Sequence, residues 1–315
     1  MYSTRAFSGS RTWRWGSDSA LDSAIASSHL MGQQLYGQTQ ILETGALLWR
    51  GDTRCSTLRN ATAIGFSFSV DFGHNGRPSI PTARMGHPEE TAMPNTTITC
   101  ADGFELGAYE ASPSGAAKGA VVVIQEIFGV NSHIRSVVDG YAEAGFYAIA
   151  PAIFDRLERD VQLGYTEDDM TAGIELAFQQ LDMSQTLTDL QATIDAAANQ
   201  GKVGVVGYCF GGLLTWLSSC NLNQVSAASA YYGGGIPDNA EMTPSCPIIL
   251  HFGEQDAHIP MDSVAAFQEK QPDLPVHVYA ADHGFNCDQR DSYDSTAASQ
   301  AKERTLALFN DNLAA

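Results

Sequence analysis

Gly201-Lys202-Val203-Gly204-Val205-Val206-Gly207-Tyr208-Cys209-Phe210-Gly211-Gly212 is the stretch of this chain that decides the fold. Its first half, up to Val206, predicts a buried strand, and a helical pattern follows over 210–219. Between them the form G-x-C-x-G predicts a sharp turn, because side chains in place of Gly207 and Gly211 would collide with neighbouring backbone. The turn presents Cys209 at the start of a helix, whose dipole and free N–H groups favour a thiolate and a developing oxyanion.

Strand and helix patterns alternate on both sides of this turn. Short apolar strands separated by helices predict a mainly parallel central sheet with helices on both faces, and the sharp turn identifies it as the α/β-hydrolase fold. A first hairpin is expected from Thr97-Ile98-Thr99 and Phe104-Glu105-Leu106. Further strands are expected at 120–124, 147–150, 226–231, 248–252 and 276–279, and helices at 132–145, 170–180, 187–199, 263–269 and 295–312.

Residues 1–92 differ in composition from the rest of the chain. They contain arginine but no lysine, are rich in Ser, Thr and Gly, and show no sustained period of a helix or strand. We expect a poorly ordered extension there and an α/β-hydrolase domain over 93–315, with Met93 as the true start of translation. An organellar transit peptide, indicated by Arg5, Arg11 and Arg14 in Ser-rich surroundings, is the alternative.

Charge and hydropathy exclude several classes of function. The net charge of −19 argues against binding to nucleic acid or to anionic lipid, which requires a basic face. The chain has no run of about 20 apolar residues, so no membrane span is expected. A run of glycines at 233–235 fails the pattern of a phosphate-binding loop, because no helix start follows it.

The cysteine pattern argues against a metal or disulfide scaffold. The six cysteines form no C-x-x-C pair, so we expect free thiols in a reducing cytoplasm and no structural zinc. No metal and no organic cofactor is predicted. A monomer or a small homo-oligomer is the expected state.

Two loops after later strands supply partners for Cys209. Asp256 follows the strand at 248–252, and His283 follows the strand at 276–279. An acid after a late strand and a histidine after the last one is the order found in α/β-hydrolases. His283 would take the thiol proton, and Asp256 would fix the tautomer of its imidazole.

Each of these assignments has an alternative. Glu254 and Asp282 are competing candidates for the acid, because both lie in the same loops. Gly207 and Gly211 would serve only packing if Cys209 were a small buried apolar residue.

The chain resembles the dienelactone hydrolase family, also called carboxymethylenebutenolidases, over about residues 97–312. The resemblance implies Cys209, Asp256 and His283 as catalytic triad, and a lactone or ester as small-molecule substrate. It further implies that Glu126 helps to generate the thiolate and that the backbone N–H groups of Ile127 and Phe210 form the oxyanion hole; otherwise Glu126 would cap a turn or face solvent. The motifs that carry it are Gln125-Glu126-Ile127-Phe128-Gly129-Val130-Asn131, the stretch 201–212, Tyr231-Tyr232-Gly233, Gln255-Asp256 and His283-Gly284-Phe285.

The chain departs from the family where the substrate carboxylate is bound. The family places arginines before Leu181 and just after the histidine, yet 170–181 has no basic residue and neither has the run Gly284-Phe285-Asn286-Cys287 after His283. Arg156 or Arg159 is a candidate substitute. The predicted function is hydrolysis of an enol-lactone or activated ester through a cysteinyl acyl-enzyme, as in aromatic-compound degradation. A redox protein that pairs Cys209 with Cys287, or a non-catalytic binding protein, is the alternative.

Overall fold

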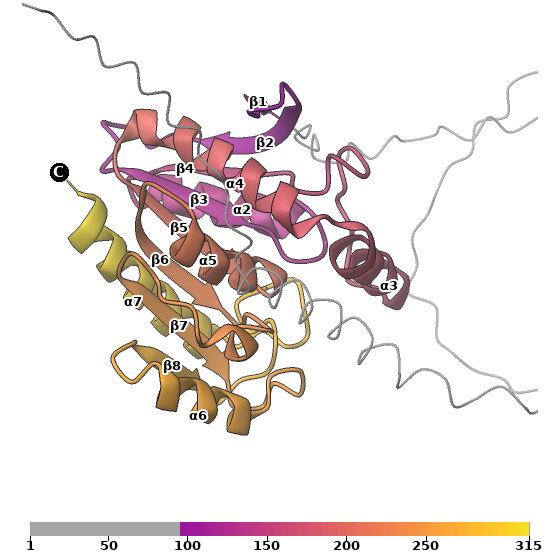
Figure 1. The fold of residues 1–315 in the computed structure, drawn as a ribbon, viewed down its shortest axis with the longest axis vertical. Helices are drawn as coiled ribbons and strands as arrows, with labels where there is room; N and C mark the ends of the chain where they lie inside the picture. The colour runs from indigo at the N-terminus through magenta and orange to yellow at the C-terminus, as the bar shows by residue number, and fades with distance from the viewer. Residues whose placement is uncertain (1–94, 315) are drawn as a thin grey trace, which may run out of the picture. The chain divides into compact units, whose positions relative to one another are not determined.

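A computed structural model describes residues 95–314 of the chain, which build one eight-stranded sheet (Figure 1). The predictions for residues 1–92 and for Met93 lie outside the described residues. The strand order is β1-β2-β4-β3-β5-β6-β7-β8. The strands are β1 (Thr96–Thr99), β2 (Glu105–Ala111), β3 (Ala120–Ile124), β4 (Tyr147–Pro151), β5 (Val203–Tyr208), β6 (Val225–Tyr231), β7 (Ile248–Gly253) and β8 (Val276–Tyr279).

The sheet is parallel from β4 to β8, as the alternation of strands and helices predicts. The predicted first hairpin is confirmed: β1 pairs antiparallel with β2, and β2 pairs antiparallel with β4 at the edge of the sheet. Every residue of β3 and β5 is buried, because helices cover both faces of the central strands. These two strands therefore provide the rigid centre on which the turn at Cys209 is built.

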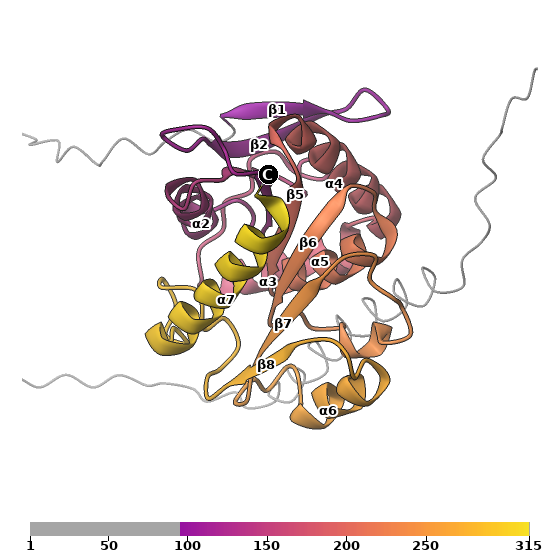
Figure 2. The ribbon, with the colours of Figure 1, turned by 90° about the vertical axis from the view of Figure 1, so that its left-hand side faces the viewer.

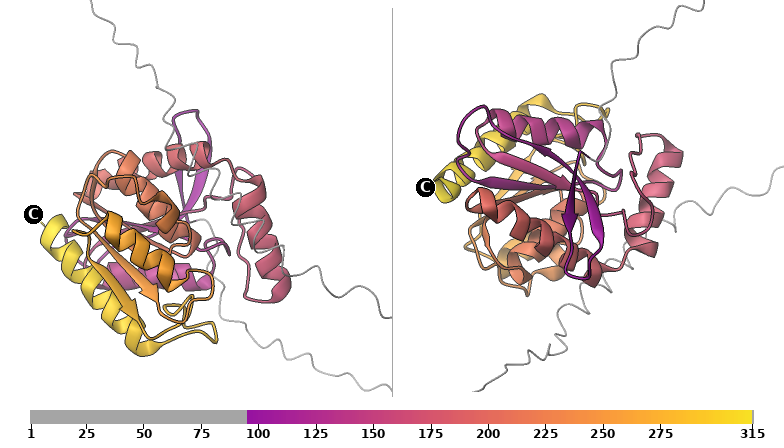
Figure 3. Two further views of the ribbon diagram at one scale, coloured as in Figure 1. Left: turned by 60° about the horizontal axis from the view of Figure 1, so that its bottom comes forward. Right: turned by 90° about the horizontal axis from the view of Figure 1, so that it is seen from above.

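Two layers of helices enclose the sheet (Figures 2 and 3). On one face lie α2 and α7, which meet where Phe309 packs against Tyr141 and Phe146. On the other face lie α4 and α5, and Trp216 of α5 packs against Phe267 of α6. These helices are α2 (Ser132–Glu143), α4 (Met183–Ala197), α5 (Phe210–Asn221), α6 (Met261–Lys270) and α7 (Ser295–Leu313), with short 3-10 turns at Ala198–Gln200 and Pro237–Asn239.

The helix predicted at 170–180 is two elements. The α-helix α3 (Glu167–Glu175) begins three residues early, because Thr166 and Asp169 form a capping box. It continues as the π-helix η1 (Leu176–Gln180), in which the N–H of Leu181 bonds to the carbonyl of Leu176. Both stand at the side of the domain rather than on a face of the sheet (Figure 3).

The remaining boundaries shift by a few residues at most. The helix predicted from 187 begins at Met183, because the Asp182 side chain accepts the N–H of Gln185 and caps it. The strands predicted at 120–124 and 276–279 are confirmed with the same bounds. Among the helices over 95–314, none combines the length and the apolar character that a membrane crossing needs.

Candidate active site

The turn after β5 is strained in the way that its glycines predict. Cys209 has φ 54° and ψ −115°, a conformation that non-glycine residues rarely adopt, and it caps the N-terminus of α5. A Cβ on Gly207 would collide with the carbonyl of Gly211, and one on Gly211 would lie 2.5 Å from the Gln125 oxygen. The backbone therefore closes tightly around Cys209 and holds its half-buried side chain at the corner between strand and helix.

The register of β3 and β5 brings Glu126 to the same edge of the sheet as Cys209. Ile124 is paired with Gly207, and each of the two residues lies two positions beyond that pair. Ile127 follows Glu126 in a turn, and Phe210 is the first residue of α5. The first N–H groups of a helix have no acceptor within the helix, so the Phe210 N–H is free to bind an oxyanion at this corner.

The acid and histidine loops meet behind Cys209. Asp256 Oδ2 lies 2.7 Å from Nδ1 of His283, and the Asp256 side chain is fully buried. Its Oδ1 accepts the backbone N–H groups of His258 and Ile259 at 2.8 and 3.2 Å. Three hydrogen bonds therefore fix the carboxylate, and the carboxylate fixes the imidazole ring.

The electrostatics of this pair favour a charged imidazole. Burial alone would lower the pKa of His283, but the negative charge of Cys209 and the hydrogen bond to Asp256 outweigh it and raise that pKa to about 10. Burial would likewise raise the pKa of Asp256, but the hydrogen bonds from His283 and His258 bring it below its ordinary value. The arrangement suits a thiolate–imidazolium pair.

The two competing acids and the neighbouring histidines have other contacts. Glu254 is exposed, and exposed Asp282 accepts the backbone N–H of His283 rather than its ring. His258 stands edge-on to the His283 ring with centroids 5.4 Å apart, so it lies beside the site. His251 is buried within β7, where its Nδ1 and the Tyr279 hydroxyl are 2.8 Å apart.

The carboxylate of Glu126 is buried and makes no hydrogen bond to the described residues. Its side chain is 1% exposed, and neither carboxylate oxygen has a hydrogen-bond partner among the described residues. Arg290 Nη1 lies 3.7 Å from its Oε1, which is an ion pair but too long for a hydrogen bond. The Arg290 guanidinium also faces the rings of Phe128 and Tyr165, each 5.7 Å away.

The sequence analysis did not identify Arg290 as a site residue, because its position depends on how the loop after His283 folds. Two successive turns, with the N–H of Cys287 bonded to Gly284 and the N–H of Arg290 bonded to Cys287, bring Arg290 back over the site. Gly284 has φ 80°, and a Cβ there would lie 2.6 Å from Arg290 Nη1. The glycine directly after His283 was the signal that could have indicated a close neighbour.

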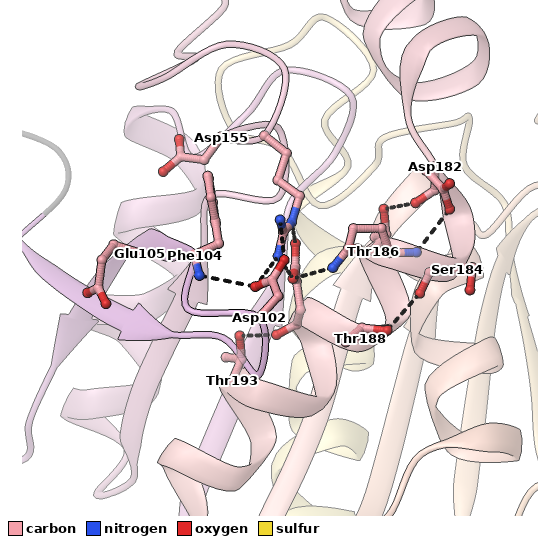
Figure 4. A network of polar contacts seen from close by, with 12 residues as sticks. Asp102, Phe104, Glu105, Asp155, Asp182, Ser184, Thr186, Thr188 and Thr193 are labelled. Carbon is pink, nitrogen blue, oxygen red and sulfur yellow. Dashed lines mark hydrogen bonds and ion pairs between the residues drawn. The ribbon is translucent and has the colours of Figure 1, made fainter.

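The two arginines proposed as substitutes are engaged elsewhere. Arg156 forms ion pairs with Asp189 at 2.6 Å and Asp102 at 2.9 Å, in the network that Figure 4 shows around Asp102. Arg159 pairs with Asp155 at 2.9 Å. The contacts of Arg156 tie the β1–β2 turn to α4. Both arginines therefore have structural partners, whereas Arg290 lies at Glu126.

Tyr232 is a second residue that the sequence analysis did not assign to the site. Its ring stands edge-on to His283 with centroids 5.1 Å apart, and its buried hydroxyl has no partner among the described residues. Burial and the charges of Glu126, Cys287 and Cys209 raise its pKa well above the ordinary value. Tyr232 therefore lies beside His283 and close enough to Glu126, Cys287 and Cys209 for their charges to act on its hydroxyl.

Comparisons with known proteins identify the family of this chain. The sequence model of the Dienelactone hydrolase family matches residues 106–313. A Synechocystis protein provisionally named a carboxymethylenebutenolidase is 37% identical and covers 67% of this chain and 93% of its own, and the Pseudomonas putida carboxymethylenebutenolidase is 34% identical with the same coverage. A solved Klebsiella pneumoniae structure, provisionally titled a dienelactone hydrolase, has 29% identity and a TM-score of 0.60 over 68% of this chain and 96% of that one. The chain therefore belongs to the dienelactone hydrolase family and is a hydrolase with the α/β-hydrolase fold.

Proposed function

We propose that this hydrolase cleaves enol-lactones or activated esters through a thioester on Cys209. The observation that carries the proposal is the 2.7 Å contact between Asp256 and His283 behind a cysteine held at the strained strand-to-helix corner. A nucleophile, a base and a group that orients the base are the parts that acyl transfer requires. The names of the relatives, carboxymethylenebutenolidases among them, support the same substrate class.

The reaction proceeds in two halves. The Cys209 thiolate attacks the carbonyl carbon, and the N–H groups of Ile127 and Phe210 stabilise the oxyanion. Collapse of the tetrahedral intermediate breaks the ester C–O bond, and the imidazolium of His283 protonates the departing oxygen. His283 then takes a proton from water, which attacks the thioester, and the acid leaves as Cys209 is restored.

The substrate needs a good leaving group. A thiolate is itself easily expelled from the tetrahedral intermediate, so an alkoxide that leaves poorly would return the enzyme to its starting state. Enolates and phenolates leave more readily, which favours enol-lactones and aryl esters over peptide amides.

Glu126 and Arg290 complete the proposed site. A carboxylate beside the thiol disfavours a second negative charge, so Glu126 would restrain the thiolate until substrate binds. Arg290 brings a guanidinium to within 3.7 Å of Glu126, and a substrate carboxylate would compete for it. Substrate binding would thus separate Glu126 from its counter-ion and alter the charge beside Cys209.

The redox alternative has less support. Cys287 is buried and its thiol donates a hydrogen bond to the Tyr165 hydroxyl at 3.2 Å. Burial and the charge of Glu126 raise the pKa of Cys287 to about 11, so its thiol is a poor partner for thiol–disulfide exchange.

The test is hydrolysis of cis-dienelactone and of p-nitrophenyl esters by wild type, Cys209→Ser and Cys209→Ala, with Cys220→Ser as the matched control. We expect both Cys209 variants to lose turnover of every substrate and the control to keep it. Intact mass spectrometry of wild type quenched during turnover should show one acyl group, on Cys209. Turnover that survives in Cys209→Ala would overturn the mechanism. If wild type hydrolyses the p-nitrophenyl esters but turns over dienelactone only slowly, and the Cys209 variants lose the ester activity, the mechanism stands and the substrate is a different ester.

A further inference from the structure

Three buried side chains with metal-ligand chemistry converge beside the proposed active site. Glu126 follows β3, His133 lies in the first turn of α2, and Cys287 lies in the loop after β8. Each offers one ligand atom, and these three atoms lie within 4.8 Å of one another. A carboxylate oxygen, an imidazole nitrogen and a sulfur are the ligand types that zinc takes from proteins.

Two of the three residues in this cluster have polar atoms that lack the partners buried groups normally have. Both oxygens of Glu126 and Nε2 of His133 have no hydrogen-bond partner among the described residues, although both side chains are more than nine-tenths buried. A buried polar group left without a partner costs about 1–3 kcal/mol, more if it is charged. A cation at this cluster would provide a partner for Glu126 and for His133 at once.

One ring nitrogen of His133 is left without a partner in the described part of the chain and can act as a metal ligand. Its Nδ1 lies 3.3 Å from Oδ1 of Asp288, which favours the tautomer with the proton on Nδ1. The lone pair of Nε2 is then free. His133 and Asp288 also line a cavity of about 310 Å³.

We propose that Glu126, His133 and Cys287 form a binding site for a divalent cation that prefers sulfur and nitrogen ligands, with Zn²⁺ as the natural probe. In a tetrahedral site with bonds of about 2.0–2.3 Å, ligand atoms lie about 3.5 Å apart. The side chains therefore need to close by about 1 Å around the ion. The thiol proton of Cys287 passes to solvent as the S–Zn bond forms, and a water fills the fourth position.

Arg290 opposes this binding. Its guanidinium lies 3.7 Å from Glu126 and would be repelled by a divalent ion. Asp288 acts in the opposite sense, because its carboxylate lies 3.3 Å from the His133 ring and its negative charge would attract the ion. Removal of the Arg290 charge should therefore strengthen metal binding, which separates a real site at Glu126 from binding elsewhere on this acidic chain.

Occupation of the site would inhibit the enzyme, a consequence that rests on the proposed function. The ion would hold Glu126 in its coordination shell and place positive charge beside Cys209. Zinc can also inhibit by binding Cys209 and His283 directly, so the metal site itself is tested without substrate and without Cys209.

The experiment is titration of Cys209→Ala with Co²⁺, whose thiolate charge-transfer band in the near ultraviolet reports a cobalt–sulfur bond, and with Zn²⁺ by calorimetry. We expect one ion per chain and a thiolate band. The affinity for each ion should fall at least about tenfold when Cys287→Ser or His133→Gln is added. It should stay unchanged when Cys246→Ser is added. Addition of Arg290→Gln should raise the affinity. No band in Cys209→Ala, or a band that survives Cys287→Ser, would overturn the proposal.

Protection of the thiol gives a second measurement that needs no change at the site. Zn²⁺ should slow alkylation of Cys287 in folded Cys209→Ala, followed by peptide mass spectrometry, and leave the rate at Cys246 unaltered. Equal rates at Cys287 with and without Zn²⁺ would also overturn the site, even if Cys287→Ser failed to fold. Because no turnover is measured, neither result depends on whether the proposed reaction is right.

Discussion

Arg290 and Glu126 face each other across 3.7 Å, and neither oxygen of the carboxylate has a hydrogen-bond partner among residues 95–314. A carboxylate that makes no hydrogen bond to its counter-ion loses less when the two separate than a carboxylate in a bidentate pair does. A substrate carboxylate can therefore compete for Arg290 with less loss than it would meet at a fully bonded pair.

Arg290→Gln is expected to discriminate between charged and neutral substrates. Loss of a charge-assisted hydrogen bond should lower kcat/KM for a carboxylate-bearing lactone about 10–100-fold, mostly through KM, and affect a neutral aryl ester far less. Steady-state kinetics on both substrates check it. Arg159→Gln is the matched control and should leave both values near wild type; equal losses on the two substrates would rule out carboxylate recognition by Arg290.

Asp256→Asn is expected to lower kcat by at least about 10²-fold while the protein stays folded. Asparagine can still accept the N–H groups of His258 and Ile259, but it cannot stabilise an imidazolium as a carboxylate does. Kinetics and thermal melting measure the two effects. Glu254→Gln, an exposed change in the same loop, should stay within a fewfold of wild type, and a comparable loss there would reassign the acid.

His283 is expected to remain protonated far above the ordinary range of histidine. Its pKa of about 10 means that its contribution to stability is fully present below pH 6.5 and is lost as the pH rises through 10. In Cys209→Ala the neighbouring charge is gone and burial lowers the pKa, so the ring should titrate at lower pH. Nitrogen-selective NMR of the imidazole follows both titrations, and identical curves would show that no thiolate charges the ring.

Arg156→Ala is expected to reduce stability rather than substrate affinity. It would leave Asp189, whose side chain is 2% exposed, without its guanidinium, at a cost of about 3–5 kcal/mol. Asp102→Asn removes only the half-exposed partner and should reduce stability less than Arg156→Ala does, because solvent screens an exposed ion pair. Urea denaturation compares the two, and a raised KM in folded Arg156→Ala would contradict this assignment.

Gly207→Ala is expected to destabilise the fold by at least about 2 kcal/mol, because its Cβ would collide with backbone that cannot move away. Gly115→Ala is the control, since no atom lies within 4 Å of a Cβ there, and it should change stability by less than about 0.5 kcal/mol. Urea unfolding of both variants gives the comparison. Equal stabilities would mean that the turn tolerates a side chain.

The sequence predicted those features that local pattern determines. Cys209, Asp256 and His283 each follow a strand of the parallel sheet, and such strands end at one edge, so their proximity follows from strand order alone. Their roles remain predictions. Arg290, by contrast, reaches Glu126 only through two loop turns, and no periodicity reports the direction of a loop.

Long-range pairing explains the other misses. Arg156 looked available because nothing near it in sequence shows that it pairs with Asp189 of α4. The sequence analysis did not consider the cluster of Glu126, His133 and Cys287, because its members come from three separate elements and share no spacing.

The π-helix at Leu176–Gln180 has an evolutionary consequence. A π-helical turn is an α-helical turn that holds one extra residue, and one residue corresponds to about 100° of rotation. Phe178, within this turn, lies edge-on to Phe210 with ring centroids 5.3 Å apart, next to the proposed oxyanion donor. Insertion or loss of a single codon here would turn the residues on either side of it by about 100° relative to each other and so move Phe178 relative to Phe210, although the sheet strands and the triad loops lie outside this helix.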